Sequence, residues 1–152
     1  MKFIADVMLG KLAKWLRILG YDTLYYHKVD ENRLLRDIQD GRILLTRNNR
    51  WRNLIPSHQL LFIRKNNPRE QIREVIKNLN LCPDKDSILE RCIVCNQILN
   101  SLPKTAVEGK VPEYIYDTSN KFLCCPRCNR IYWQGSHRDR MLKEIDEILI
   151  EQ

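Results

Sequence analysis

Four cysteines in two closely spaced pairs are the residues of this sequence best suited to bind a metal ion. Each pair has the spacing C-x-x-C, and 29 residues lie between the two pairs. Two thiolates at this spacing can bind one cation within a tight turn, and two such turns provide the tetrahedral four-sulfur ligand set of structural zinc sites. The predicted zinc ligands are Cys92, Cys95, Cys125 and Cys128.

The residues around these cysteines favour zinc over the alternatives, which are two disulfides or buried thiols. Asn96 and Asn129 follow the two pairs, and asparagine accepts the positive φ that a metal-binding turn requires after its second cysteine. The chain begins with an apolar run that stops at Asp6, which is not typical of a signal peptide. We therefore expect a cytoplasmic, reducing environment, which disfavours disulfides. Cys124 is an alternative ligand to Cys125, although Pro126 favours a turn that starts at Cys125.

A second group of candidate ligands is rich in oxygen and lies in the first half of the chain. Asp6 follows the first apolar run, Asp30 precedes a helical pattern, and Asn48 follows a later apolar run. Carboxylate and amide oxygens are ligands for Mg²⁺ or Mn²⁺, and such an ion can activate water for phosphodiester hydrolysis. The alternative interpretation is that Asp30 is a helix N-cap and Asp6 is a strand-end acid without catalytic function.

Alternating short apolar runs and amphipathic stretches must position these groups. The pattern predicts strands at 2–5, 23–26, 43–46 and 59–63, and helices at 9–19, 30–41 and 67–79. Such alternation predicts an α/β fold, a mostly parallel sheet flanked by helices, with its site at the carboxyl ends of the strands. We expect this domain to span 1–81, and 82–152 to form a small β zinc ribbon with a C-terminal helix.

Charge and composition narrow the classes of function. Residues 1–81 carry 16 Lys and Arg against 8 Asp and Glu, a net charge of +8, whereas residues 82–152 have a net charge of −1. A basic half favours a polyanionic partner, nucleic acid first. The five glycines are dispersed, which excludes glycine-rich phosphate-binding loops, and no apolar run is long enough to span a membrane.

Several basic residues and one aromatic residue are placed where they could contact RNA. Three of the basic residues recur every third position on the first predicted helix, and the others follow the third strand near Asn48. Cations hold the phosphate backbone and an indole stacks on a base; the alternative is an ordinary polar helix face and a solvated loop. The predicted RNA-binding residues are Lys11, Lys14, Arg17, Arg47 and Trp51.

Three blocks of the sequence resemble the Mut-seven C-terminal ribonuclease-domain family. These blocks are residues 3–22, 42–47 and 125–137, and the resemblance covers nearly the whole chain. It implies a PIN-like nuclease domain joined to a zinc ribbon, with RNA as the substrate. Family members usually have aspartate where this chain has Asn48. An amide contributes no charge to a metal site, so the substitution should weaken metal binding.

Two principal hypotheses follow. In the first, the protein is a metal-dependent ribonuclease, with Asp6 and Asp30 as principal ligands of Mg²⁺ or Mn²⁺ and Asn48 as a weak one. In the second, it binds RNA through a degenerate PIN-like site and does not cut. A zinc-ribbon adaptor for protein partners is a third hypothesis, and it predicts no salt-dependent binding of RNA.

Overall fold

The computed structural model describes residues 1–150 of the chain. The chain divides into two compact units, Met1–Asn96 and Gln97–Gln152. The first unit therefore includes residues 82–96, and with them the first cysteine pair, Cys92 and Cys95.

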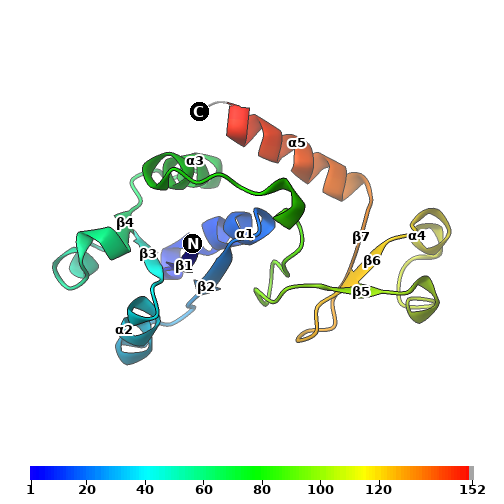
Figure 1. Cartoon of the computed structure of the whole chain (residues 1–152), viewed down its shortest axis with the longest axis horizontal. Coiled ribbons are helices and arrows are strands. Elements are labelled where there is room, and N and C mark those ends of the chain that lie inside the picture. The colour runs from blue at the N-terminus through cyan, green and yellow to red at the C-terminus, as the bar shows by residue number, and fades with distance from the viewer. Residues whose placement is uncertain (151–152) are drawn as a thin grey trace. The chain divides into compact units, whose positions relative to one another are not determined.

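A four-stranded parallel sheet forms the centre of the first unit (Figure 1). Its strands are β1 (Lys2–Ala5), β2 (Asp22–Tyr25), β3 (Ile43–Thr46) and β4 (Leu60–Phe62). The order across the sheet is β2-β1-β3-β4, and every neighbouring pair is parallel. This arrangement confirms the α/β sheet that the alternating sequence pattern predicts.

Helices follow the strands as the sequence pattern predicts. They are α1 (Gly10–Ile18), α2 (Glu31–Gln39) and α3 (Pro68–Leu79). Short 3-10 segments, which the sequence did not indicate, connect the elements: η1 (Val7–Leu9), η2 (Asn49–Asn53), η3 (Ser57–Gln59) and η4 (Lys85–Ser87). Asn67 caps α3 and Pro68 occupies its first turn, as expected for residues that satisfy or lack the free N–H groups there.

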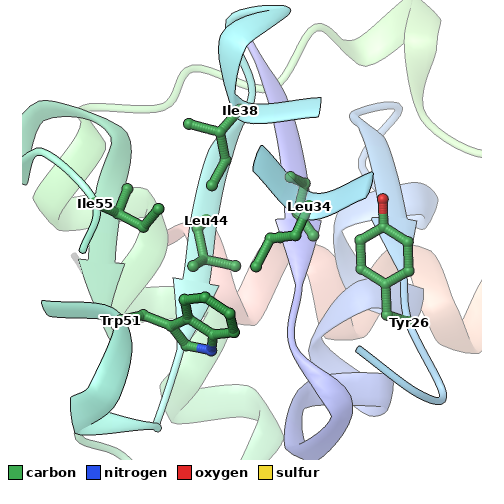
Figure 2. Packing of buried hydrophobic residues seen from close by; sticks show 7 residues of the cluster. Tyr26, Leu34, Ile38, Leu44, Trp51 and Ile55 are labelled. Carbon is green, nitrogen blue, oxygen red and sulfur yellow. The ribbon is translucent and has the colours of Figure 1, made fainter. Parts of the chain in front are cut away.

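One apolar cluster packs α2 and the segment after β3 against the sheet. Figure 2 shows the Trp51 ring beside Leu44 of β3, with Leu34 and Ile38 of α2 in the same cluster. Side chains that alternate on a strand and recur every three or four residues on a helix meet at such a face. This packing fixes the segment that carries Asn48, because Trp51 lies three residues beyond it.

The second unit contains a small antiparallel sheet and two helices. The strands β5 (Asn100–Leu102), β6 (Phe122–Cys124) and β7 (Ile131–Trp133) lie in the order β5-β6-β7. The 3-10 segment η5 (Lys104–Ala106) and helix α4 (Glu113–Thr118) lie between β5 and β6, and α5 (Ser136–Ile150) follows β7. A small apolar core contains the buried side chains of Val107, Ile115 and Phe122. Within residues 1–150, no helix combines the length and apolar character needed to cross a membrane.

Candidate active site and metal centre

The carboxyl ends of β1 and β3 form the switch point of the parallel sheet. The chain places β2 on one side of β1 and β3 on the other, so the strand order reverses between β1 and β3. Segments that leave the sheet at such a point diverge and create a crevice for ligands. Asp6 directly follows β1, and Thr46 is the last residue of β3.

Hydrogen bonds join three polar residues at this point. Asp6 is only 4% exposed, and its two carboxylate oxygens accept from the Val7 N–H at 2.7 Å and the Thr46 hydroxyl at 2.7 Å. The same Thr46 hydroxyl oxygen accepts from the Asn48 backbone N–H at 3.0 Å. Thr46 thereby links Asp6 to Asn48, two of the residues that the sequence predicts for catalysis.

Asp30 lies at the start of α2, where it acts as the N-cap. Its side chain is exposed and accepts from the Arg33 N–H at 3.2 Å. The next residue, Glu31, forms an ion pair with Arg50 of η2, so the start of α2 lies close to the segment after β3. The capping interpretation of Asp30 is therefore confirmed, and its role as a metal ligand stays a prediction.

Four cysteine sulfur atoms form a compact cluster. The Sγ atoms of Cys92, Cys95, Cys125 and Cys128 all lie within 4.8 Å of one another. Four thiolates at this separation can hold one metal ion such as zinc. Among residues 1–150, no comparable group of three or more His, Cys, Asp or Glu side chains includes Asp6 or Asp30.

Both cysteine turns have the backbone geometry that the sequence predicts. Asn96 and Asn129 have φ values of 65° and 58°, the left-handed conformation expected after the second cysteine of each pair. The Asn96 N–H donates to the Cys92 carbonyl and the Asn129 N–H donates to the Cys125 carbonyl, each at 2.9 Å. The matching turns support Cys125 rather than Cys124 as the ligand, since Cys125 is the residue in the cluster.

The predicted RNA-binding cations divide into accessible and buried residues. Lys11 and Lys14 are exposed on α1, and Arg47 is half-buried with its guanidinium 2.5 Å from Asn66 Oδ1. Arg17 is only 6% exposed, and Trp51 is 3% exposed. This burial gives Arg17 and Trp51 little surface for contact with RNA, and their role in RNA binding stays a prediction.

Packing explains why both side chains are buried. Side chains three positions apart on an α-helix point in directions that differ by about 60°. Arg17 is six positions after Lys11, so it points about 120° away from Lys11 and lies on the inward face of α1. The indole ring of Trp51 packs in the apolar cluster with Leu44 (Figure 2). A large aromatic side chain gains more from this burial than from exposure.

Sequence reasoning missed an aromatic pair at the same edge of the sheet. Tyr25 ends β2, its hydroxyl donates to the Val7 carbonyl at 3.0 Å, and the exposed His27 ring packs edge-on against it at 4.6 Å. Gly10 permits this approach, because a Cβ there would lie 3.0 Å from the Tyr25 ring. The position of Tyr25 near the end of a predicted strand, and of His27 directly after that strand, was the available signal.

The fold and the two groups of residues together define an α/β protein with linked polar side chains at the carboxyl ends of β1 and β3 and four cysteines that could hold a metal ion. A family model described as the Mut7-C RNAse domain matches residues 1–145. The chain belongs to the Mut7-C RNAse domain family, and this membership supports a ribonuclease-like function that acts on RNA. Searches of curated proteins and of solved structures found no match.

Proposed function

We propose that this chain hydrolyses RNA phosphodiesters in the crevice at the carboxyl ends of β1 and β3, with the help of Mg²⁺ or Mn²⁺. The observation that carries the proposal is the buried carboxylate of Asp6 at the switch point of the sheet. No basic side chain within residues 1–150 forms an ion pair with Asp6. A buried negative charge without a counter-charge is costly, and a divalent cation would balance it.

The donor atoms at the crevice suit a hard cation. Asp6 and Asp30 contribute carboxylates and Asn48 contributes an amide oxygen, and each oxygen of Asp6 retains a lone pair beyond its hydrogen bond. When bound, Mg²⁺ or Mn²⁺ would stabilise the negative charge that develops on the phosphate. Thr46 holds the Asp6 carboxylate in place through its hydroxyl group.

Basic residues that follow β1 and β3 in the chain would hold the RNA backbone. Lys11 and Lys14 are exposed on α1, which begins only four residues after Asp6. Arg47 directly follows β3. Their positive charges would bind phosphates on either side of the scissile bond, because phosphate contacts supply most of the sequence-independent affinity for nucleic acid.

The proposal is tested by cleavage of a labelled structured RNA in Mn²⁺. Asp6→Asn removes the charge but retains an acceptor for the Val7 N–H, and we expect it to lower the rate by about a hundredfold or more. Asp40→Ala is the matched control, because Asp40 is an exposed acid at the C-terminal end of α2, whereas Asp30 lies at its N-terminal end. Equal rates for wild type and Asp6→Asn would reject Asp6 as a catalytic ligand.

A second candidate function is RNA binding without cleavage, and Asn48 favours it. The Asn48 side-chain oxygen accepts from the Arg50 N–H at 3.0 Å and so caps η2, and the amide carries no charge. Asn48→Asp preserves this cap, since aspartate is an equally good capping residue, and restores a carboxylate. Cleavage by Asn48→Asp but not by wild type would establish a degenerate nuclease that binds RNA.

We also infer that the four-cysteine centre holds structural zinc. Four thiolates leave no open coordination position for a substrate, so the ion would stabilise the fold. We expect about one zinc ion per purified chain, measured by elemental analysis. Cys95→Ser removes one ligand and should lower both the zinc content and the unfolding temperature.

A further inference from the structure

Arg17 is a buried arginine whose hydrogen bonds reach the first cysteine turn. Its Nη1 donates to the carbonyl oxygens of Ile93 at 2.9 Å and Val94 at 3.0 Å, the two residues between Cys92 and Cys95. Its Nε donates to the Thr23 carbonyl of β2 at 2.9 Å. One guanidinium therefore connects α1, β2 and the metal-binding turn within the first unit.

The charge of Arg17 needs a partner that these acceptors do not provide. All three acceptors are neutral backbone carbonyls. The nearby carboxylate of Asp22 is already paired with Arg42, at 2.8 and 3.0 Å. A guanidinium keeps its proton at any physiological pH, and a buried charge without compensation is strongly destabilising.

The cysteine cluster provides that compensation only when it holds a metal. Four thiolates with one Zn²⁺ carry a net charge of −2, whereas disulfides or protonated thiols carry none. The two carbonyls that Arg17 binds lie between two of the predicted ligands, so the guanidinium lies beside the anionic centre. Burial lowers the pKa of Arg17, and the thiolates of Cys92 and Cys95 act in the opposite direction.

We propose that Arg17 is a positioning residue of the metal centre: it holds the Cys92–Cys95 turn and supplies the buried positive charge that balances the thiolates. The inference rests on the four-thiolate centre described under the proposed function and is independent of RNA cleavage. It gives Arg17 a defined role in place of the RNA contact predicted from the sequence.

The arrangement also couples the metal centre to the parallel sheet. β2 is an edge strand of the parallel sheet, and both backbone groups of Thr23 are bonded by side chains: the N–H donates to Asn96 Oδ1 at 2.9 Å, and the carbonyl accepts from Arg17. Asn96 Nδ2 also donates to Asp22 Oδ1 at 2.7 Å. Asn96 of the metal-binding turn and Arg17 thus provide hydrogen-bond partners for the backbone of β2 at its open edge. Loss of the metal should expose these backbone groups.

The test measures zinc affinity by competition with a chromophoric chelator for the full chain. We expect Arg17→Met to weaken zinc binding by about 10- to 100-fold, the usual effect of removing a residue that orients metal ligands, and Arg17→Lys to restore part of the loss. Arg36→Met is the matched control, because Arg36 is exposed on α2 and the substitution changes the charge equally. Substitution with Co²⁺ gives a second readout, since its absorption reports the geometry of the four sulfur ligands.

If Arg17→Met binds zinc as tightly as the wild type, the proposal is overturned. It is also overturned if the substitution lowers the unfolding temperature equally in the presence and absence of zinc. If Arg17→Met does not fold, the wild-type protein still provides a test. The Arg17 Nε–H should give a protected NMR signal in the zinc-bound protein and lose it when zinc is chelated, and an unchanged signal would contradict the proposal. A wild-type chain that binds no zinc would reject the metal centre and this role together, whereas absent RNA cleavage would leave both standing.

Discussion

At the scale of single residues, Thr46 has the largest structural role in the candidate active site. Its buried hydroxyl donates to Asp6 and accepts from Asn48, so one oxygen atom orders two of the proposed site residues. The sequence pattern indicated only that Thr46 ends a strand. Its function as a link depends on the register that places β3 beside β1.

Replacement of Thr46 tests this link. Thr46→Val keeps the shape of the side chain but leaves a buried carboxylate oxygen and the Asn48 N–H without their partner, which should cost about 1–3 kcal/mol of stability. Thr46→Ser keeps the hydroxyl and should retain the RNA-cleavage rate better than Thr46→Val. Urea denaturation and the Mn²⁺ cleavage assay measure the two effects, and identical behaviour of the two variants would contradict the argument.

At the scale of elements, two glycines that follow helices allow a matched comparison. Gly20 follows α1 with φ +89°, and Gly41 follows α2 with φ +84°. A Cβ at Gly20 would lie 2.6 Å from the Ser87 carbonyl oxygen, whereas a Cβ at Gly41 would meet nothing within 4 Å. The two positions therefore share a positive φ of similar size and differ in their surroundings.

Alanine at each position separates the free-energy cost of the backbone conformation from the cost of the steric contact. Gly41→Ala should cost about 1 kcal/mol, the penalty for a left-handed backbone in a residue with a Cβ. Gly20→Ala should cost about 3 kcal/mol, because the chain must also move away from the Ser87 backbone. Chemical denaturation measures both values. Equal losses of stability would show that the segment around Ser87 can move without a cost in free energy.

A hydrogen bond between Tyr26, which directly follows β2, and Asp37 of α2 should make the stability of the protein depend on pH. The Tyr26 hydroxyl donates to Asp37, and burial together with this bond raises the pKa of Tyr26 to about 12. An unfolded tyrosine loses its proton near pH 10, so this contribution to stability is complete below that pH and is lost as the pH rises toward 12.

The variant Tyr26→Phe removes this dependence. Between about pH 10 and about pH 12, the wild type should lose more stability than Tyr26→Phe, because only the wild type releases a proton on unfolding from this site. Urea midpoints across this range are the measurement, and absorbance titration locates the tyrosine pKa. Parallel curves for the two proteins would assign the alkaline loss to other groups.

At the scale of the whole molecule, the positive charge of residues 1–81 should govern binding to RNA. The net charge of +8 is confined to this part of the sequence, and Lys11 and Lys14 are exposed beside the proposed crevice. Each phosphate contact on a single strand contributes about 0.7 to the slope of log affinity against log salt concentration. Binding should therefore weaken steeply as the salt concentration rises.

A double charge reversal on α1 tests whether this helix causes the salt dependence of RNA binding. Replacing Lys11 and Lys14 with Glu should lower affinity for RNA and reduce the salt slope by about 1.4. Replacing Arg36 and Lys77 with Glu changes the net charge equally, and both residues are exposed on other helices. Fluorescence anisotropy with labelled RNA measures both variants. Equal losses would show that binding depends on net charge and not on α1.

The sequence by itself determined features that depend on local chemistry. The C-x-x-C pairs, the positive φ of Asn96 and Asn129, the caps at Asp30 and Asn67, and the alternation of strands and helices all follow from the properties of neighbouring residues. Each can be read from composition and spacing, because the interacting groups lie within a few residues of one another.

Only the tertiary structure decided which polar groups are buried and what they contact. Arg17 looked like a surface cation and Trp51 like an exposed aromatic, yet α1 turns Arg17 onto β2 and the metal-binding turn, and the core includes Trp51. The bonds between Arg17 and Val94 and between Asp6 and Thr46 span 77 and 40 residues. Contacts at such separations depend on strand order and helix rotation, which local sequence patterns do not specify.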